Sequence, residues 1–284
     1  MLKELFRIAP KLESDGSFSP SKLALKLAVP ATTDYVPIVY KKYTGAKSKI
    51  AVIFTEQKNM TMKNGKMFST GNHPVEAILP MLHLQEAGFT FDIITPTGKP
   101  VVFEMWAMPK DDVAVNGFYK QYETAFKAPK SLVDFVAHDL EMDASYAAVF
   151  VPGGHGAMLG IPEDINVGKT LHWAHEKGLF TITLCHGPGA LLATKLVDGK
   201  FIYHGYQMTV FPDSVDKQTP MIGYLPGHMP WQLNEQLTGL GAVIVNKKAD
   251  NETIIDRKLI TGASPMAANA LGKLSAETLL NSLS

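Results

Sequence analysis

The chain has 284 residues, with 27 basic and 27 acidic side chains and a formal net charge of zero at pH 7. No net field draws such a chain toward phosphate backbones or anionic lipids, so we expect no membrane partner and no stable nucleic-acid complex. Its apolar runs are far shorter than the roughly 18 residues of a membrane-spanning helix. A single cysteine excludes an intrachain disulfide, and the mixed charges of the first residues do not fit a signal peptide. Together these features predict a cytoplasmic protein.

Residues 1–48 are rich in Ser, Lys, Pro and Thr and show no sustained period, so we predict an N-terminal arm that forms part of a small cap domain. An α/β catalytic core is predicted over 49–284. Short apolar runs typical of buried strands recur along this core, at 49–55, 89–95, 146–152, 179–184, 242–246 and 258–262. Helical stretches separate most of these runs, and that alternation predicts a mostly parallel sheet covered by helices on both faces.

A helix is predicted from Pro74 to Gly88, because proline favours the first turn of a helix and glycine favours its end. Residues 104–143 interrupt the alternation of strands and helices, and a further helix is predicted within them at 131–140. We therefore predict that 104–143 form a cap insertion over the ends of the strands.

Catalytic residues are expected at strand-to-helix junctions, because ligands of open α/β sheets bind beyond the carboxyl ends of the strands. The apolar run 179–184 leads directly into Cys185, and the small residues that follow favour an immediate helix. Such a turn exposes its side chain, and a helix N-terminus lowers the pKa of a thiol. Cysteine is also common in cores, but this placement favours a nucleophile.

His186 follows the thiol directly. Neighbouring residues on a regular helix do not face each other, so His186 can serve Cys185 only if the backbone bends sharply between them. The alternative is a solvated histidine without a catalytic role.

A second junction, PGGHGA, follows the run 146–152. Its glycines allow the backbone to approach a ligand closely, and an oxyanion hole built around Gly154 and His155 would suit it. A tight turn that simply needs glycine is the plainer alternative. The glycine spacing does not match a dinucleotide-binding fingerprint, which excludes a dinucleotide site.

Two acidic residues are further candidates. Glu76 lies in the first turn of the helix that Pro74 opens, where it could exchange a proton with substrate or merely complement the helix dipole. Asp213 follows a strand-like segment and could orient His186, as the third member of a triad orients its base. An aspartate that begins a turn after proline is the alternative for Asp213.

Five motifs occur in a fixed order along the chain: GNHPVE, PGGHGA, LCHGP, FPDSVDKQTPMIGYLPGH and TGASPMAANALGKL. Together they closely resemble the HchA family, bacterial heat-shock chaperones that also act as glutathione-independent glyoxalase III within the ThiJ/PfpI superfamily. The resemblance implies an α/β fold, a flavodoxin-like three-layer sandwich with a mostly parallel sheet (class I glutamine amidotransferase-like) and a small cap domain, assembled as a homodimer. It assigns the catalytic set to Cys185, His186, Asp213 and Glu76.

The chain departs from the family at one place. Characterised members carry a metal site of two histidines and one carboxylate, whereas this sequence has Gln85, Thr90 and Tyr122 at the aligned positions. These side chains do not recreate that ligand set. We predict no bound metal and no other cofactor.

The resemblance implies methylglyoxal and glyoxal as substrates and D-lactate as a product, the activity of a glyoxalase III, or D-lactate dehydratase. In this hypothesis the Cys185 thiolate adds to the aldehyde, and Glu76 or His186 removes the former aldehyde proton. A related deglycase activity would act on methylglyoxal- and glyoxal-glycated proteins or nucleic acids. Two alternatives stay open: a stress-induced chaperone that holds unfolded proteins, and a cysteine peptidase.

Overall fold

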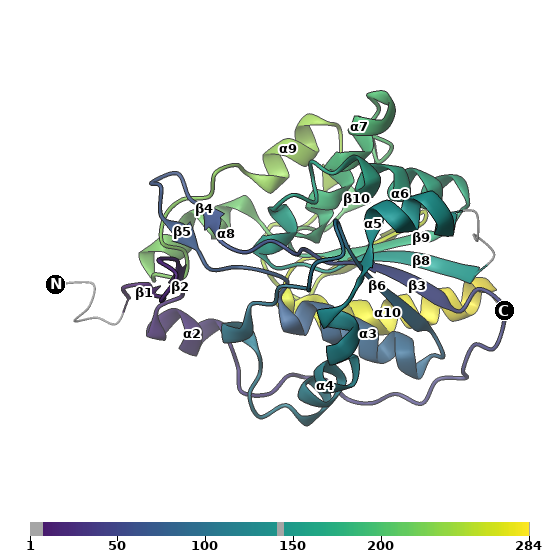
Figure 1. Ribbon diagram of the computed structural model, residues 1–284, viewed down its shortest axis with the longest axis horizontal. Coiled ribbons are helices and arrows are strands. Elements are labelled where there is room, and N and C mark those ends of the chain that lie inside the picture. The colour runs from purple at the N-terminus through teal and green to yellow at the C-terminus, as the bar shows by residue number, and fades with distance from the viewer. Residues whose placement is uncertain (1–7, 141–144, 284) are drawn as a thin grey trace.

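A seven-stranded sheet forms the centre of the computed structural model, which describes residues 8–140 and 145–283 (Figure 1). The strand order is β12-β13-β9-β8-β3-β6-β7, and every neighbouring pair is parallel except β12 and β13. The strands are β3 (Lys49–Ile53), β6 (Thr90–Thr95), β7 (Lys130–Ser131), β8 (Tyr146–Val151), β9 (Phe180–Leu184), β12 (Thr253–Asp256) and β13 (Leu259–Gly262). This arrangement confirms the predicted mostly parallel sheet.

Helices cover both faces of the sheet. The α-helices are α2 (Lys22–Ala28), α3 (Pro74–Glu86), α4 (Val113–Lys127), α5 (Leu132–Asp134), α6 (Ile165–Glu176), α7 (Lys195–Asp198), α8 (Asp213–Gln218), α9 (Leu233–Gly239) and α10 (Ala268–Leu283). Shorter helical segments are η1 (Met105–Ala107), η2 (Phe135–Asp139), η4 (His155–Met158), η5 (Gly187–Thr194), η6 (Thr219–Met221) and η7 (Pro265–Ala267). No helix in the described ranges is long and apolar enough to cross a bilayer.

Successive side chains of the central strand β3 point into two separate cores. Ile50 and Val52 pack with the residues of α3 and α10, whereas Ala51 and Ile53 pack with those of α6 and η5. Side chains alternate between the faces of a strand, so a strand buried on both faces must be apolar throughout. The result is the predicted flavodoxin-like three-layer sandwich.

Helices α3 and α10 pack closely against each other. Proline at the first position of α3 suits the helix start, where its missing N–H leaves no bond unmade. Pro80 lies inside the same helix and cannot donate to the carbonyl four residues earlier, which belongs to Glu76. Gly272 of α10 lets the two helices approach, because a Cβ there would lie 2.9 Å from Cα of Pro80.

A small four-stranded sheet lies beyond one end of the central sheet (Figure 1). Its order is β1-β2-β5-β4, and its strands are β1 (Lys11–Leu12), β2 (Phe18–Ser19), β4 (Met60–Thr61) and β5 (Met67–Phe68). This cap therefore combines strands from both sides of the predicted boundary between residues 48 and 49. Strands β10 (Gln207–Met208) and β11 (Val243–Ile244) pair with each other in a separate sheet. The run 242–246 therefore lies outside the central sheet.

The structure corrects the expectation that 104–143 form a cap insertion. Strand β7 pairs with β6 at the edge of the central sheet, and α4 packs against α3. The physical reason is the aromatic face of α4, whose Phe118 and Phe126 are buried in the core beside α3. Residues 104–140 therefore belong largely to the core, and 141–143 lie outside the described residues.

Two glycine substitutions test the packing of α10 on α3. Alanine is favoured over glycine inside a helix by about 1 kcal/mol, so Gly117→Ala, where a Cβ meets nothing within 4 Å, should raise the free energy of unfolding. Gly272→Ala should lower it by roughly 1–3 kcal/mol, because overpacking against backbone atoms outweighs the gain in propensity. Urea denaturation of both variants measures this difference, and equal stabilisation by both would contradict the close approach.

Candidate active site

Cys185 occupies a sharp elbow between β9 and η5. Its backbone has a φ of +58°, in the left-handed region that non-glycine residues rarely adopt. The backbone N–H of Cys185 donates to the carbonyl of Gly262 at 2.8 Å, and its own carbonyl accepts from Phe211 at 2.9 Å. A Cβ on Gly153 would lie 2.8 Å from Cβ of Cys185, so glycine is needed there. The elbow is the bend that the sequence required between Cys185 and His186.

The elbow brings the His186 ring against the thiol. Nδ1 of His186 lies 3.3 Å from Sγ of Cys185, and Nε2 lies 2.8 Å from Oδ2 of Asp216. When Nε2 donates its proton to the carboxylate, Nδ1 is left as an acceptor for the thiol proton. Burial lowers the pKa of His186, with a further contribution from the neighbouring His155 ring, so the imidazole is neutral at rest. The three side chains form a Cys-His-Asp relay.

The aspartate of this relay is Asp216, and the expectation that Asp213 orients His186 is wrong. The Asp213 carboxylate accepts the backbone N–H groups of Asn234 and Glu235 at 3.0 and 3.2 Å, at the start of α9. Both aspartates lie in the first turn of α8, three residues apart, and the turn of the helix points only Asp216 toward the imidazole. Sequence reasoning missed Asp216, although the same motif, FPDSVDKQTP, contains it.

Asp216 also binds a second histidine. Nε2 of His155 lies 2.9 Å from Oδ1 of Asp216, and the rings of His155 and His186 have centroids 4.1 Å apart. Burial on its own would lower the pKa of His155, but the carboxylates of Asp216 and Glu104 raise it overall. Burial likewise opposes ionisation of Asp216, yet its two histidine partners hold the pKa of Asp216 below its ordinary value. The Asp216 carboxylate thus favours the cationic form of His155.

Glu76 lies on the other side of the thiol. Its carboxyl hydrogen-bonds to the Cys185 thiol and to the backbone N–H of Gly154. Burial, and then the nearby Glu104, raise the pKa of Glu76 well above its usual range. Burial and the neighbouring Glu76 also raise the pKa of the Cys185 thiol. Burial thus favours the protonated forms of both the carboxyl and the thiol.

The backbone N–H groups of the two predicted oxyanion residues lie beside different ionisable side chains. The backbone N–H of Gly154 acts on the thiol of Cys185 and opposes the rise of its pKa, so it lies near the position where charge on a bound aldehyde oxygen would develop. The backbone N–H of His155 instead hydrogen-bonds to the carboxyl of Glu104. Gly154 is thus in place for an oxyanion role, whereas the N–H of His155 is already engaged by another group.

Glu104 is a buried acid that sequence reasoning did not single out. The hydroxyl of Thr70 donates to its Oε1 at 2.6 Å, and among the described residues its Oε2 has no hydrogen-bond partner. Burial raises the pKa of Glu104 to about 7, against the opposing effect of His155. The sequence signal that could have identified Glu104 is an acidic residue inside the apolar stretch FEMWAM.

The aligned positions of the family metal site do not fit a metal. Oε1 of Gln85 accepts a hydrogen bond from the hydroxyl of Tyr122 at 3.0 Å, and the hydroxyl of Thr90 faces the carbonyl of Ser48. In the described part of the chain, ligand atoms of His155, His186 and Asp216 do lie within 4.8 Å of one another. Those atoms already hydrogen-bond to one another, so the relay accounts for the cluster.

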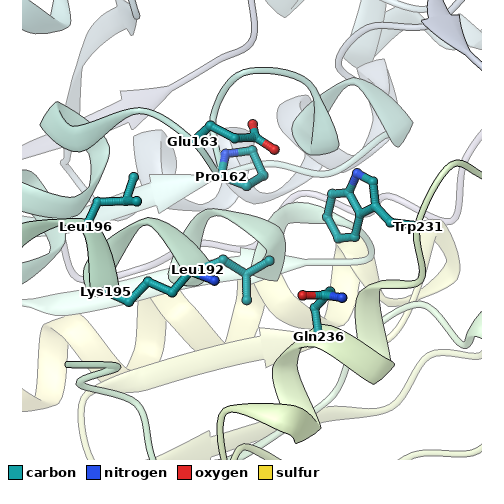
Figure 2. Close-up of a pocket in the computed structure, with 7 residues that line it drawn as sticks. All are labelled: Pro162, Glu163, Leu192, Lys195, Leu196, Trp231 and Gln236. Atoms are coloured by element: carbon teal, nitrogen blue, oxygen red, sulfur yellow. The ribbon is translucent and has the colours of Figure 1, made fainter. Parts of the chain in front are cut away.

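Two pockets lie near these elements. A cavity of about 440 Å³ includes His73, the residue before α3, in its wall. A smaller pocket of about 160 Å³ is lined by Glu163, Lys195 and Trp231 among others (Figure 2). None of the residues of the Cys185 relay lines the smaller pocket, so it lies outside the candidate site.

The fold and the site define a class of protein: an α/β protein with a thiol nucleophile on a strand-to-helix elbow. The model of the DJ-1/PfpI family matches residues 67–218, a range that contains the whole relay. Protein/nucleic acid deglycase HchA of Escherichia coli O157:H7 (strain EC4115 / EHEC) is 45% identical over 269 residues, 95% of this chain and 94% of that protein. HchA of Escherichia coli (strain K12 / DH10B) gives the same values. The chain belongs to the DJ-1/PfpI family and, within it, to the HchA group.

Solved structures share the fold. Glyoxalase III from Candida albicans has a TM-score of 0.64 at 21% identity, covering 84% of this chain and 98% of that one. Rapid Encystment Protein 24 KDa from Francisella tularensis has a TM-score of 0.67 at 20% identity, covering 82% and 99%. These structures confirm the architecture that the motifs predicted.

Glu104 makes stability depend on pH. Its pKa in the folded protein, about 7, lies above the ordinary value of 4.5, so between these values the folded state holds a proton that the unfolded state has released. Stability therefore falls as pH rises through this window, by up to about 1.4 kcal/mol per pH unit. Glu104→Gln should flatten part of this decline, because the amide carries no titratable proton.

Chemical denaturation between pH 5 and 8 measures this effect. Glu76 contributes in the same direction, so some slope should persist in Glu104→Gln. Glu123→Gln, at a partly exposed position of α4, is the control and should leave this slope unchanged. A wild-type slope retained in full by Glu104→Gln would contradict the assignment of that proton.

Proposed function

We propose that this protein converts methylglyoxal to D-lactate without glutathione and releases related adducts from glycated molecules. The observation that carries the proposal is the position of one thiol between a neutral imidazole acceptor and a protonated carboxyl. The HchA relatives, named protein/nucleic acid deglycase, support the same chemistry, since the chain matches them along nearly its whole length.

The first step forms a bond between Sγ of Cys185 and the aldehyde carbon. The thiol proton passes to Nδ1 of His186, 3.3 Å away, and Asp216 stabilises the imidazolium that results. The aldehyde oxygen receives the proton of Glu76, while the N–H of Gly154 hydrogen-bonds to the charge that develops. The product is a neutral hemithioacetal, so the buried site gains no net charge.

The second step moves hydrogen between two carbons. Having given up its proton, the Glu76 carboxylate removes the carbon-bound hydrogen of the hemithioacetal, and its raised pKa makes it a stronger base than an ordinary glutamate. Imidazolium His186 protonates the ketone oxygen, which gives an enediol and a neutral His186. The proton on Glu76 then passes to the neighbouring carbon as His186 takes the hydroxyl proton from the sulfur-bearing carbon, which becomes the carbonyl of the thioester. Water then hydrolyses the lactoyl thioester to lactate and the free thiol. No external oxidant or reductant is consumed.

Burial of the thiol favours this chemistry over the rival functions. Cys185 is 2% exposed and Glu76 is 1% exposed, which suits a small aldehyde better than the backbone of a polypeptide. Peptidase activity therefore has less support than aldehyde turnover. A chaperone function and the homodimer stay predictions of the sequence resemblance, and the cytoplasmic location stays a prediction from the composition.

The first test is D-lactate formation from methylglyoxal in the absence of glutathione. Wild type should be active, Cys185→Ser should be inactive, and Glu76→Gln should lose roughly 10²–10⁴-fold in kcat, the usual contribution of general acid–base catalysis. Glu163→Gln, in the separate pocket of Figure 2, is the matched control and should retain activity. Absence of lactate with folded wild type, or full activity of Cys185→Ser, would overturn the proposal.

A second pair of variants tests the choice of aspartate. Asp216→Asn should lower kcat roughly 10⁴-fold, because the amide favours the wrong tautomer of His186. Asp213→Asn should change kcat by less than about threefold and affect mainly stability, since that carboxylate caps α9. Steady-state kinetics of both variants decides the matter, and the reverse ranking would restore Asp213 to the relay.

A further inference from the structure

His73 and Glu76 occupy the two positions of α3 from which side chains usually cap a helix. Pro74 restricts the residue before it to extended backbone, and the His73 ring makes no capping hydrogen bond. A glutamate at the third helical position often reaches back to the N–H of the cap residue, but here that N–H donates to the carbonyl of Gly153 at 3.0 Å. Neither side chain is therefore engaged in capping the helix.

The imidazole of His73 faces the carboxyl of Glu76 without touching it. Nδ1 of His73 lies 3.9 Å from Oε1 of Glu76, which is too long for a direct hydrogen bond and suits one bridging water. Nδ1 is buried and makes no hydrogen bond to any described residue, and His73 is only 6% exposed. An unpaired buried polar atom is costly, so this atom marks a place where water or a ligand completes the bonding.

The two side chains differ in how readily they take up a proton. Burial, and then the neighbouring His155 ring, lower the pKa of His73 to about 3, so this imidazole stays neutral. With its proton on Nε2, a neutral ring presents Nδ1 as an acceptor. The raised pKa of Glu76 makes its carboxylate the stronger base of the two. The pair thus combines a fixed acceptor with a base.

His73 also connects this pair to the large cavity. Its side of α3 lines the cavity of about 440 Å³, together with Val75 and Met266. On the side of the reaction, the carboxyl of Glu76 hydrogen-bonds to the Cys185 thiol. Water bound at Nδ1 can therefore exchange with the cavity and lies next to the carboxyl that contacts the sulfur.

We propose that His73 binds and orients the water that hydrolyses the lactoyl thioester on Cys185. Nδ1 of His73 and the carboxylate of Glu76 hold one water by its two hydrogens. A water bound in this way keeps both lone pairs available to the carbonyl carbon of the thioester. This inference rests on the proposed function, because the thioester is an intermediate of that reaction.

The step completes the reaction without a further reactant. The oxygen of the water bonds to the thioester carbon, and the carbon–sulfur bond breaks. One proton of the water passes to the Glu76 carboxylate, and imidazolium His186 protonates the departing sulfur of Cys185. Lactic acid leaves, and the thiol, the carboxyl and the imidazole return to the protonation states from which the first step began. His73 stays neutral throughout.

Two substitutions of His73 separate its hydrogen bond from its packing. His73→Phe keeps a ring of similar size without the acceptor, and it should slow hydrolysis of the thioester roughly 10²-fold, a usual cost of lost positioning. His73→Asn places an amide oxygen close to the position of Nδ1 and should restore hydrolysis to within about tenfold of wild type. His172→Asn, on α6 and outside the relay, is the matched control and should hydrolyse the thioester at the wild-type rate.

Isolation of the thioester provides a measurement that a merely structural role would not change. Each protein is exposed briefly to methylglyoxal, passed rapidly through gel filtration to remove free aldehyde, and denatured in acid for mass spectrometry. A thioester survives this treatment, whereas a hemithioacetal dissociates. His73→Phe should accumulate the thioester on Cys185 that wild type hydrolyses. Hydroxylamine, a nucleophile that needs no bound water, should release it from the isolated protein as lactohydroxamate.

The outcomes separate this inference from the proposed function. An unchanged kcat in His73→Phe would overturn the role of His73, and so would a lowered kcat without accumulated thioester, because the defect would then precede hydrolysis. Equal slowing by phenylalanine and asparagine would overturn the role of the acceptor atom. Absence of both lactate and thioester in folded wild type would instead overturn the proposed function. Thioester accumulation in His73→Phe, with recovery in His73→Asn, is the expected result.

Discussion

The left-handed backbone at Cys185 is the constraint on which the arrangement of the site depends. A non-glycine residue in this region costs roughly 1–2 kcal/mol, and the surrounding backbone holds it there through hydrogen bonds to Gly262 and Phe211. The same bend lets two residues adjacent in sequence face each other, which a regular helix forbids. Because Gly153 packs on the inside of the bend, the neighbouring strand can bring Gly154 to the thiol.

Burial then governs the protonation of the ionisable side chains around the elbow. Desolvation raises the pKa of Glu76 and Glu104 and so favours their neutral forms, whereas Asp216 stays ionised because two histidines share its carboxylate. Both arrangements avoid an isolated charge in a dry interior, which is prohibitively costly. The arrangement stores a transferable proton on Glu76 and leaves an acceptor on His186, so acid and base lie on opposite sides of one sulfur.

Much of the candidate site was predictable from the sequence because its reactive residues lie where strands end. Cys185, His186, Gly154 and Glu76 could be placed from apolar runs, glycines and a proline, and the structure brings all four together. The choice between Asp213 and Asp216 could not be made in the same way, since residues three apart in one helical turn differ only in where the helix points them. That direction is set by long-range packing and not by local pattern.

Pro80 has a consequence for how α3 responds to strain. Its missing N–H leaves the carbonyl of Glu76 without the usual helical partner, while Gly272 clamps the later turns of α3 against α10. The first turn is tied instead to the Gly153 carbonyl through the N–H of His73. The hydrogen-bond ladder of α3 is therefore interrupted between the turn that carries the acid and the turns packed on α10, so the position of the acid depends on the contacts that bury its own turn.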